Sequence, residues 1–124
     1  MINLDEILSS PSLTEGRTYK QVLQRAYAYV EPHDQWTQGT FARDDCGVSV
    51  KPRDPRAMCW CLMGAIACSS NAYGLIPPAI IKYLTSMKDY LYPDRFDSVG
   101  SMNDYLDHAS VLAFLKVCVD NIPD

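Results

Sequence analysis

No apolar run in the chain approaches the roughly 18 residues that a membrane-spanning helix needs, which excludes a membrane span. Positive charge is not in excess either: 11 Lys and Arg stand against 15 Asp and Glu, a net charge of −4. This balance argues against nucleic-acid binding, which depends on Lys and Arg. The opening residues MINLDEILSS lack a basic stretch followed by an apolar one. We therefore expect no secretory signal peptide and a cytoplasmic location.

The signatures G-x-G-x-x-G, the P-loop and H-E-x-x-H are also missing, so no cofactor is expected from a motif. What the sequence does have is a length of 124 residues and a hydrophobic fraction of 48%. These values exclude intrinsic disorder and predict a single globular domain over residues 1–124. Five cysteines in a chain without a signal peptide predict free thiols in a reducing compartment.

The first half of the chain predicts two helices and a hairpin. A short turn is expected over Leu4–Leu8, and a longer helix begins at Thr18, which forms a T-x-x-Q capping box with Gln21. Pro32 ends that helix. Near residues 40–50, two short β-prone segments flank the D-x-x-G turn that starts at Asp44, which predicts a small hairpin packed against helices.

A central helix is predicted near residues 55–70. Asp54 is a suitable N-cap and Pro55 a suitable first helical residue. The segment that follows is apolar on all sides, which is typical of a helix covered by its neighbours. Its small residues recur at i, i+3, i+4 and i+7, so another backbone, from a helix or from the hairpin, can come close: Cys61, Gly64, Ala65 and Cys68.

The second half predicts two more helices. One begins at Pro77-Pro78 and presents apolar residues as far as Leu91, and the last begins near Asp107 and ends before Pro123, with a loop over residues 93–100 between them. The expected fold is mostly α (α+β): a compact bundle of about four to five helices around a buried central helix, with one small β-hairpin.

Cys61 admits three interpretations. Packing in the core is the first, because free Cys is among the most buried residue types. The second is a hydrolase nucleophile with His108 as base and Asp104 as its orienting acid. A thiolate metal site is the third, but the four cysteines Cys46, Cys59, Cys61 and Cys68 form no C-x-x-C pair, so no metal site is predicted.

Two polar groups could serve binding. Trp36 and Gln38 precede the hairpin, and Trp36 either packs the hairpin onto the helices or lines a ligand pocket together with Gln38. Asn103 and Asp104 lie far downstream and either cap a short turn or form a polar corner of the same pocket. A small basic cluster is either a solvated face or a site for one phosphate or an acidic partner: Lys51, Arg53 and Arg56.

The pattern W-x-Q-G, A-x-D, G, D-P-x-A-x-x-W-C-x-x-G-A and N-D runs from Trp36 to Asp104. It resembles an uncharacterised family, a domain of unknown function carried by bacteria and their tailed phages, over roughly residues 18–120. The resemblance implies a shared fold and genomic setting, not a reaction. It also implies that one shared feature contains Trp36, Gln38, Cys61, Gly64, Asn103 and Asp104. His108 is not part of that pattern.

Three functions follow as hypotheses. The preferred one is a small binding protein, a phage or mobile-element accessory factor that acts on a host protein or on a second copy of itself. The second is a small-ligand binder, with the four polar residues forming the pocket and the basic cluster favouring a nucleotide. The third is the hydrolase, which requires a solvent-reachable Cys61 sulfur within hydrogen-bond reach of His108.

Overall fold

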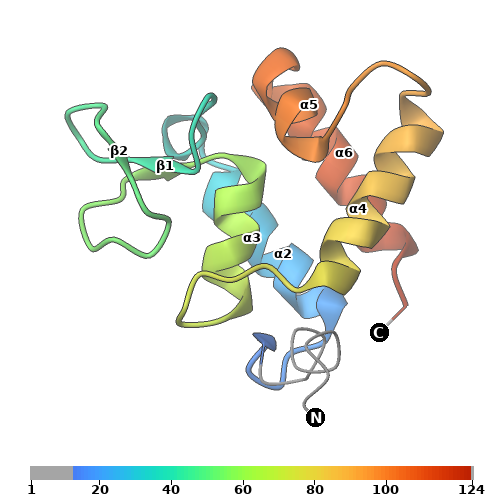
Figure 1. The fold of residues 1–124 in the computed structure, drawn as a ribbon, viewed down its shortest axis with the longest axis horizontal. Helices are drawn as coiled ribbons and strands as arrows, with labels where there is room; N and C mark the ends of the chain where they lie inside the picture. The colour runs from blue at the N-terminus through green and yellow to red at the C-terminus, as the bar shows by residue number, and fades with distance from the viewer. Residues whose placement is uncertain (1–12, 124) are drawn as a thin grey trace, which may run out of the picture.

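A computed structural model describes residues 13–123 of the chain. The turn predicted over Leu4–Leu8 lies outside the described residues. The fold is mixed α+β, as the sequence predicts, with five α-helices and a small three-stranded sheet in the described part of the chain. The sheet lies at one end of the molecule and α4 at the other (Figure 1).

The first helix and the hairpin form where the sequence predicts them. Helix α2 (Tyr19–Val30) begins with the full capping box, in which Thr18 and Gln21 each bond the backbone of the other. Strands β1 (Ala42–Arg43) and β2 (Ser49–Val50) pair in antiparallel register through the Asp44–Gly47 turn. Between α2 and β1, residues His33–Gln35 form a 3₁₀ turn, η2.

The predicted helix at 55–70 is wrong in its first half. Strand β3 (Cys59–Trp60) pairs with β1, so that β1 is the middle strand, and helix α3 (Leu62–Ser70) begins only after it. Asp54 accepts the backbone N–H of Arg56 at 2.8 Å inside a turn instead of starting a helix. An Asp-Pro pair fits a turn as well as a helix start, and pairing with β1 decided between them.

The remaining helices are α4 (Pro78–Leu91), α5 (Val99–Tyr105) and α6 (His108–Asn121). Helix α4 has Pro78 in its first turn, and α6 is capped by Asp107, as predicted. Helix α5 was not predicted: its start falls in the expected loop, and its cap is Ser98, which accepts the N–H of Ser101 at 3.0 Å.

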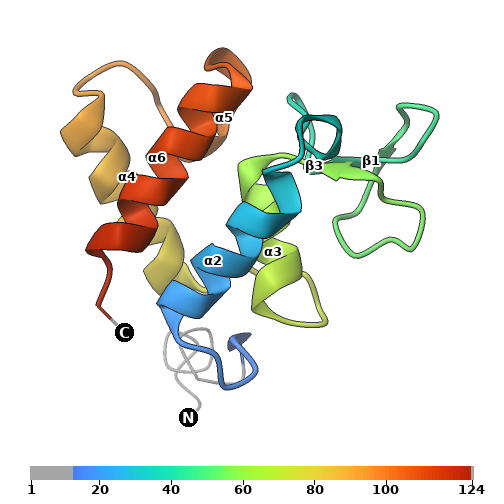
Figure 2. The ribbon, with the colours of Figure 1, turned by 180° about the vertical axis from the view of Figure 1, so that it is seen from behind.

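Helix α2 packs on both α3 and α6 and lies between them in Figure 2. One hydrophobic cluster joins α2 to the helices α3–α6, with Leu23, Ile66, Leu84, Met102 and Leu115 among its fully buried members. No helix within residues 13–123 combines the length and the apolar character needed to cross a bilayer.

Helix α3 is enclosed by its neighbours: eight of its nine residues are buried. Its C-terminal carbonyls are satisfied by two arginines from other segments. Arg17 donates to the carbonyls of Ser69 and Ser70 at 3.4 and 3.3 Å, and Arg53 donates to that of Cys68 at 3.2 Å. Cations at this end also complement the negative pole of the helix dipole.

Candidate functional site

Asn103 is the centre of a hydrogen-bond network between α5 and the loop before the sheet. Its side chain is fully buried. Its Oδ1 accepts the indole N–H of Trp36 at 2.9 Å and the backbone N–H of Leu62 at 3.1 Å. Its Nδ2 donates to the carbonyl of Thr37 at 3.2 Å and to Oδ1 of Asp104 at 3.1 Å. The four hydrogen bonds of this amide hold together three segments of the chain: α5, the loop before β1 and the start of α3.

Gln38 and Gly39 complete what we call the Asn103 network. Gln38 Nε2 donates to the carbonyls of Asn103 and Leu106 at 3.0 and 2.9 Å. The N–H of Gly39 donates to Oδ1 of Asp104 at 2.8 Å. The four residues predicted for a ligand pocket are therefore brought together. Most of their polar atoms bind one another, so Trp36, Gln38 and Asn103 position the backbone.

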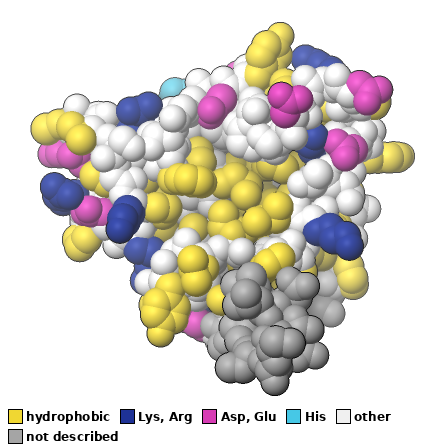
Figure 3. Space-filling model, viewed as in Figure 1, with side chains coloured by type: hydrophobic (Ala, Val, Ile, Leu, Met, Phe, Trp, Pro, Cys, Tyr) yellow, Lys and Arg dark blue, Asp and Glu magenta, His cyan; other side chains and the backbone are white. Residues whose placement is uncertain are grey.

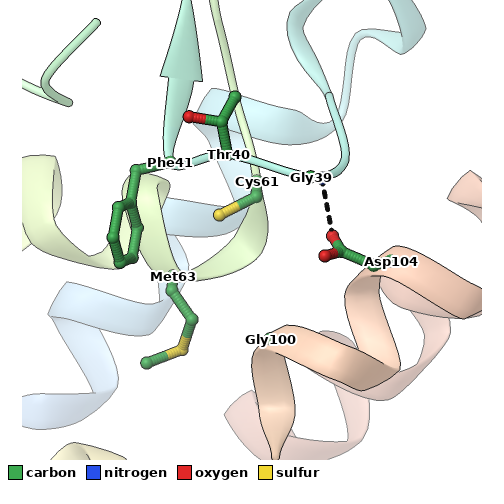
Figure 4. Close-up of a pocket in the computed structure, with 7 residues that line it drawn as sticks. All are labelled: Gly39, Thr40, Phe41, Cys61, Met63, Gly100 and Asp104. Atoms are coloured by element: carbon green, nitrogen blue, oxygen red, sulfur yellow. Dashed lines mark hydrogen bonds between the residues drawn. The ribbon is translucent and has the colours of Figure 1, made fainter. Parts of the chain in front are cut away.

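A pocket of about 210 Å³ lies beside this network, between β1, the start of α3, and α5 (Figure 4). We call it the Cys61 pocket. Its lining comes from these seven residues: Gly39, Thr40, Phe41, Cys61, Met63, Gly100 and Asp104. Only Cys61 and Asp104 among them belong to the predicted candidates. Phe41, Met63 and Gly100 were missed, because only the tertiary packing of three elements brings them to one place.

Cys61 is the N-cap of α3, and its Sγ accepts the N–H of Gly64 at 3.3 Å. The residue is 6% exposed. Burial raises the pKa of the Cys61 thiol, the Gly64 and Met63 amides act in the opposite direction, and the negative charge of Asp104 raises it further. The group is thus a protonated thiol at neutral pH, in the environment of an inert cysteine.

The imidazole of His108 is not paired with the thiol of Cys61. Its Nε2 lies 2.6 Å from the carbonyl oxygen of Val30, and its ring packs against Trp36 and His33 with centroids 5.3 and 5.0 Å away. The Cys61 pocket is lined without it. The geometry therefore lacks the Cys–His pair that the hydrolase hypothesis requires, and Cys61 is a buried residue.

Because Gly64 has no side chain, the backbone at Phe41 can lie directly against α3. A Cβ built on this glycine would stand 2.0 Å from the carbonyl oxygen of Phe41 and 2.9 Å from its carbonyl carbon. The small residues of the central segment thus admit a second backbone, which comes from the hairpin. This contact places Phe41 and Cys61 side by side at the rim of the pocket, and the N–H of Cys61 donates to the Phe41 carbonyl at 3.1 Å.

The predicted basic cluster lies elsewhere. Arg53 binds the C-terminal end of α3, opposite the end where the pocket lies. Arg56 pairs with Asp54 at 2.9 Å, and this hydrogen-bonded partner lowers the pKa of the Asp54 carboxyl to about 2. Neither arginine, nor Lys51, lines the Cys61 pocket.

Among residues 13–123, one group of potential metal ligands has its atoms within 4.8 Å of one another: Asp44, Asp45 and Cys46. Asp44 Oδ1 already accepts the backbone N–H groups of Cys46 and Val48, both at 2.9 Å, in the hairpin turn. The cluster is accounted for by that turn.

The fold and the site define a small α+β protein in which a buried amide network supports a shallow pocket at the start of a buried helix. The chain belongs to the family of unknown function DUF6197, whose sequence profile matches residues 14–121. No curated protein and no solved structure gives a significant match.

Proposed function

We propose that this protein binds another protein and that the Cys61 pocket receives a side chain of that partner. The observation that carries the proposal is an apolar hollow on the face shown in Figure 3, over the region between α3 and the α4–α5 side of the molecule. Phe41, at the rim of the pocket, is 54% exposed, and Met63 lies half-buried beside it. Exposed apolar surface around a concave site is typical of protein-binding surfaces.

The size of the pocket separates this function from small-ligand binding. Its volume of about 210 Å³ is below the roughly 300–1,000 Å³ of pockets that enclose a cofactor-sized ligand. A nucleotide would also need cations for its phosphates, and the arginines predicted for that task bind Cys68 and Asp54. One amino-acid side chain fits the volume and the apolar lining better.

A wider groove of about 510 Å³ lies between α2 and α6. Three exposed polar side chains account for much of its lining: Gln24, Glu31 and Lys116. Such a groove is typical of ordinary solvated surface. The Cys61 pocket differs because a buried network holds its walls in place.

The resemblance to a family of bacteria and tailed phages supports a finer version of the proposal. The partner would then be a host protein, and the encounter would occur in the bacterial cytoplasm. The five cysteines are all free, which agrees with a reducing compartment.

The test is selection from a library of 12-residue peptides displayed on phage, with the full-length protein as bait. We expect peptides that bind the natural protein and bind Met63→Lys at least about tenfold more weakly, because a half-buried ammonium group would replace the apolar wall. Phe41→Ser is a second variant with little effect on folding, since that side chain is more than half exposed.

Tyr73→Lys is the matched control, because it introduces the same charge at a residue that is 83% exposed and does not line the pocket. It should bind the selected peptides as the natural protein does. Failure to select any peptide, or equal binding by the natural protein, Met63→Lys and Phe41→Ser, would overturn the proposal.

A further inference from the structure

Asp104 gives the Cys61 pocket a fixed negative charge. Its Oδ1 is held by the N–H of Gly39 at 2.8 Å and by Nδ2 of Asn103 at 3.1 Å. Because Asn103 is itself buried and held by further hydrogen bonds, the carboxylate has little freedom to move. Asp104 is an exposed residue, and these two hydrogen bonds are what distinguish its carboxylate from that of a freely rotating surface aspartate.

The second oxygen of Asp104, Oδ2, receives no hydrogen bond within the described part of the chain. Asp104 also takes part in none of the four ion pairs found there. Figure 4 shows this oxygen on the side that faces Cys61 and the interior of the pocket. The rise in the Cys61 pKa that the Asp104 charge causes agrees with their proximity. The pocket therefore has an anionic oxygen open to an incoming donor.

The rest of the lining is of a different kind. Phe41 and Met63 supply apolar surface, and Gly39 and Gly100 add no charged group. An apolar wall next to one anionic oxygen matches a side chain with an aliphatic stem and a cationic end. The ring of Phe41 adds a face on which such a cation is attracted. The protein as a whole is acidic, with a net charge of −4, which favours the approach of a basic partner.

We infer that the partner side chain seated in the Cys61 pocket is basic, a lysine or an arginine, with its stem on Phe41 and Met63 and its cation paired with Asp104. The inference rests on the proposed function. Only Oδ2 is open, so the pair forms through one carboxylate oxygen. An apolar pocket without this carboxylate would favour leucine or methionine instead.

The test uses peptides selected on the natural protein. We expect them to share a lysine or arginine at one position. Replacing that residue with norleucine, which keeps an unbranched aliphatic stem without the charge, should weaken binding at least about tenfold. On Asp104→Asn the same replacement should change binding less than about twofold, because the anion is already gone. Asn retains the Oδ1 acceptor that binds Gly39, so the variant keeps the wall of the pocket.

Asp120→Asn is the matched control, since it removes one negative charge from the exposed face of α6. It should retain the preference for a basic residue. Selected peptides with a shared aliphatic residue, no basic residue and equal affinity for Asp104→Asn would overturn the inference and leave the proposed function standing. Selected peptides that bind Met63→Lys and Phe41→Ser as well as they bind the natural protein would overturn the proposed function itself.

Discussion

The buried side-chain amide of Asn103 links α5 to two other segments of the chain. It satisfies the indole of Trp36 and the first amide of α3 with a single oxygen. We expect Asn103→Ala to lower the free energy of unfolding by about 2–4 kcal/mol, because each buried donor left without an acceptor costs about 1–3 kcal/mol. Urea unfolding measures the loss.

The control for this change is Asn121→Ala, at an exposed position where the amide binds only the carbonyl of Val117, at 2.8 Å. It should cost far less than Asn103→Ala. Equal effects at the two positions would show that the network adds little to stability.

The cysteines differ in burial, and their reactivity should follow it. Cys46 is exposed, whereas Cys61, Cys68 and Cys118 are buried, and burial raises the pKa of Cys118 to about 12. With iodoacetamide between pH 5 and 9, mass spectrometry should find Cys46 alkylated first and those three only after unfolding. Fast alkylation of Cys61 with a midpoint well below about 8.5 would instead mark it as a nucleophile.

Asp54 provides a pH-dependent contact. Its pKa in the folded protein is about 2, below the value of about 3.9 for an unfolded chain. A lowered carboxyl pKa stabilises the fold fully above the unfolded value, and this contribution is lost as the pH falls through the folded one. An NMR titration should place the midpoint of Asp54 near 2, and Arg56→Ala should raise it. No change in that variant would exclude Arg56 as the cause.

At the scale of elements, the contact between α3 and the hairpin depends on Gly64. Replacing a glycine inside a helix with alanine usually stabilises the helix by about 1 kcal/mol. Here the new Cβ would overlap the carbonyl oxygen of Phe41, at 2.0 Å. We therefore expect Gly64→Ala to lower the free energy of unfolding by about 1–3 kcal/mol or more, measured by urea unfolding.

Gly100 is the matched control, because it also lies in a helix and a Cβ there would meet only the Ser98 hydroxyl, at an ordinary 3.7 Å. Gly100→Ala should raise the melting temperature or leave it unchanged. Destabilisation of similar size in both variants would contradict the steric explanation.

The elements also show what can be predicted from sequence. The capping box at Thr18 and the cap at Asp107 are local signals, and their helices form as predicted. Strand β3 was missed because two apolar residues fit a helix and a buried strand equally well, and only pairing with β1 distinguishes them. Helix α5 was missed because its seven residues include Gly100 and show little periodicity.

The candidate site could also be predicted only in part. The sequence brought forward Trp36, Gln38, Asn103 and Asp104 as one group, and the structure brings them together. Their hydrogen bonds could not be predicted, because each joins residues about 65 positions apart. The structure distinguishes the four residues: all of them take part in the Asn103 network, and only Asp104 among them also lines the Cys61 pocket.

At the scale of the whole molecule, the helices differ in how well they are enclosed. Eight of nine residues in α3 are buried, compared with three of 14 in α4. Local opening is easiest where little apolar surface is buried. We expect the amides of α4 to exchange with deuterium before those of α3 in the native protein, as followed by NMR. Faster exchange in α3 would place the stable part of the fold elsewhere.

The separation of the two walls along the chain has a consequence for synthesis. Phe41, Cys61 and Met63 leave the ribosome well before Gly100 and Asp104, which close the other side. A nascent chain that has reached only α4 contains the apolar residues of one side of the pocket and still lacks the carboxylate of Asp104. If the proposed function holds, the preference for a basic side chain would therefore arise only when α5 packs beside the start of α3.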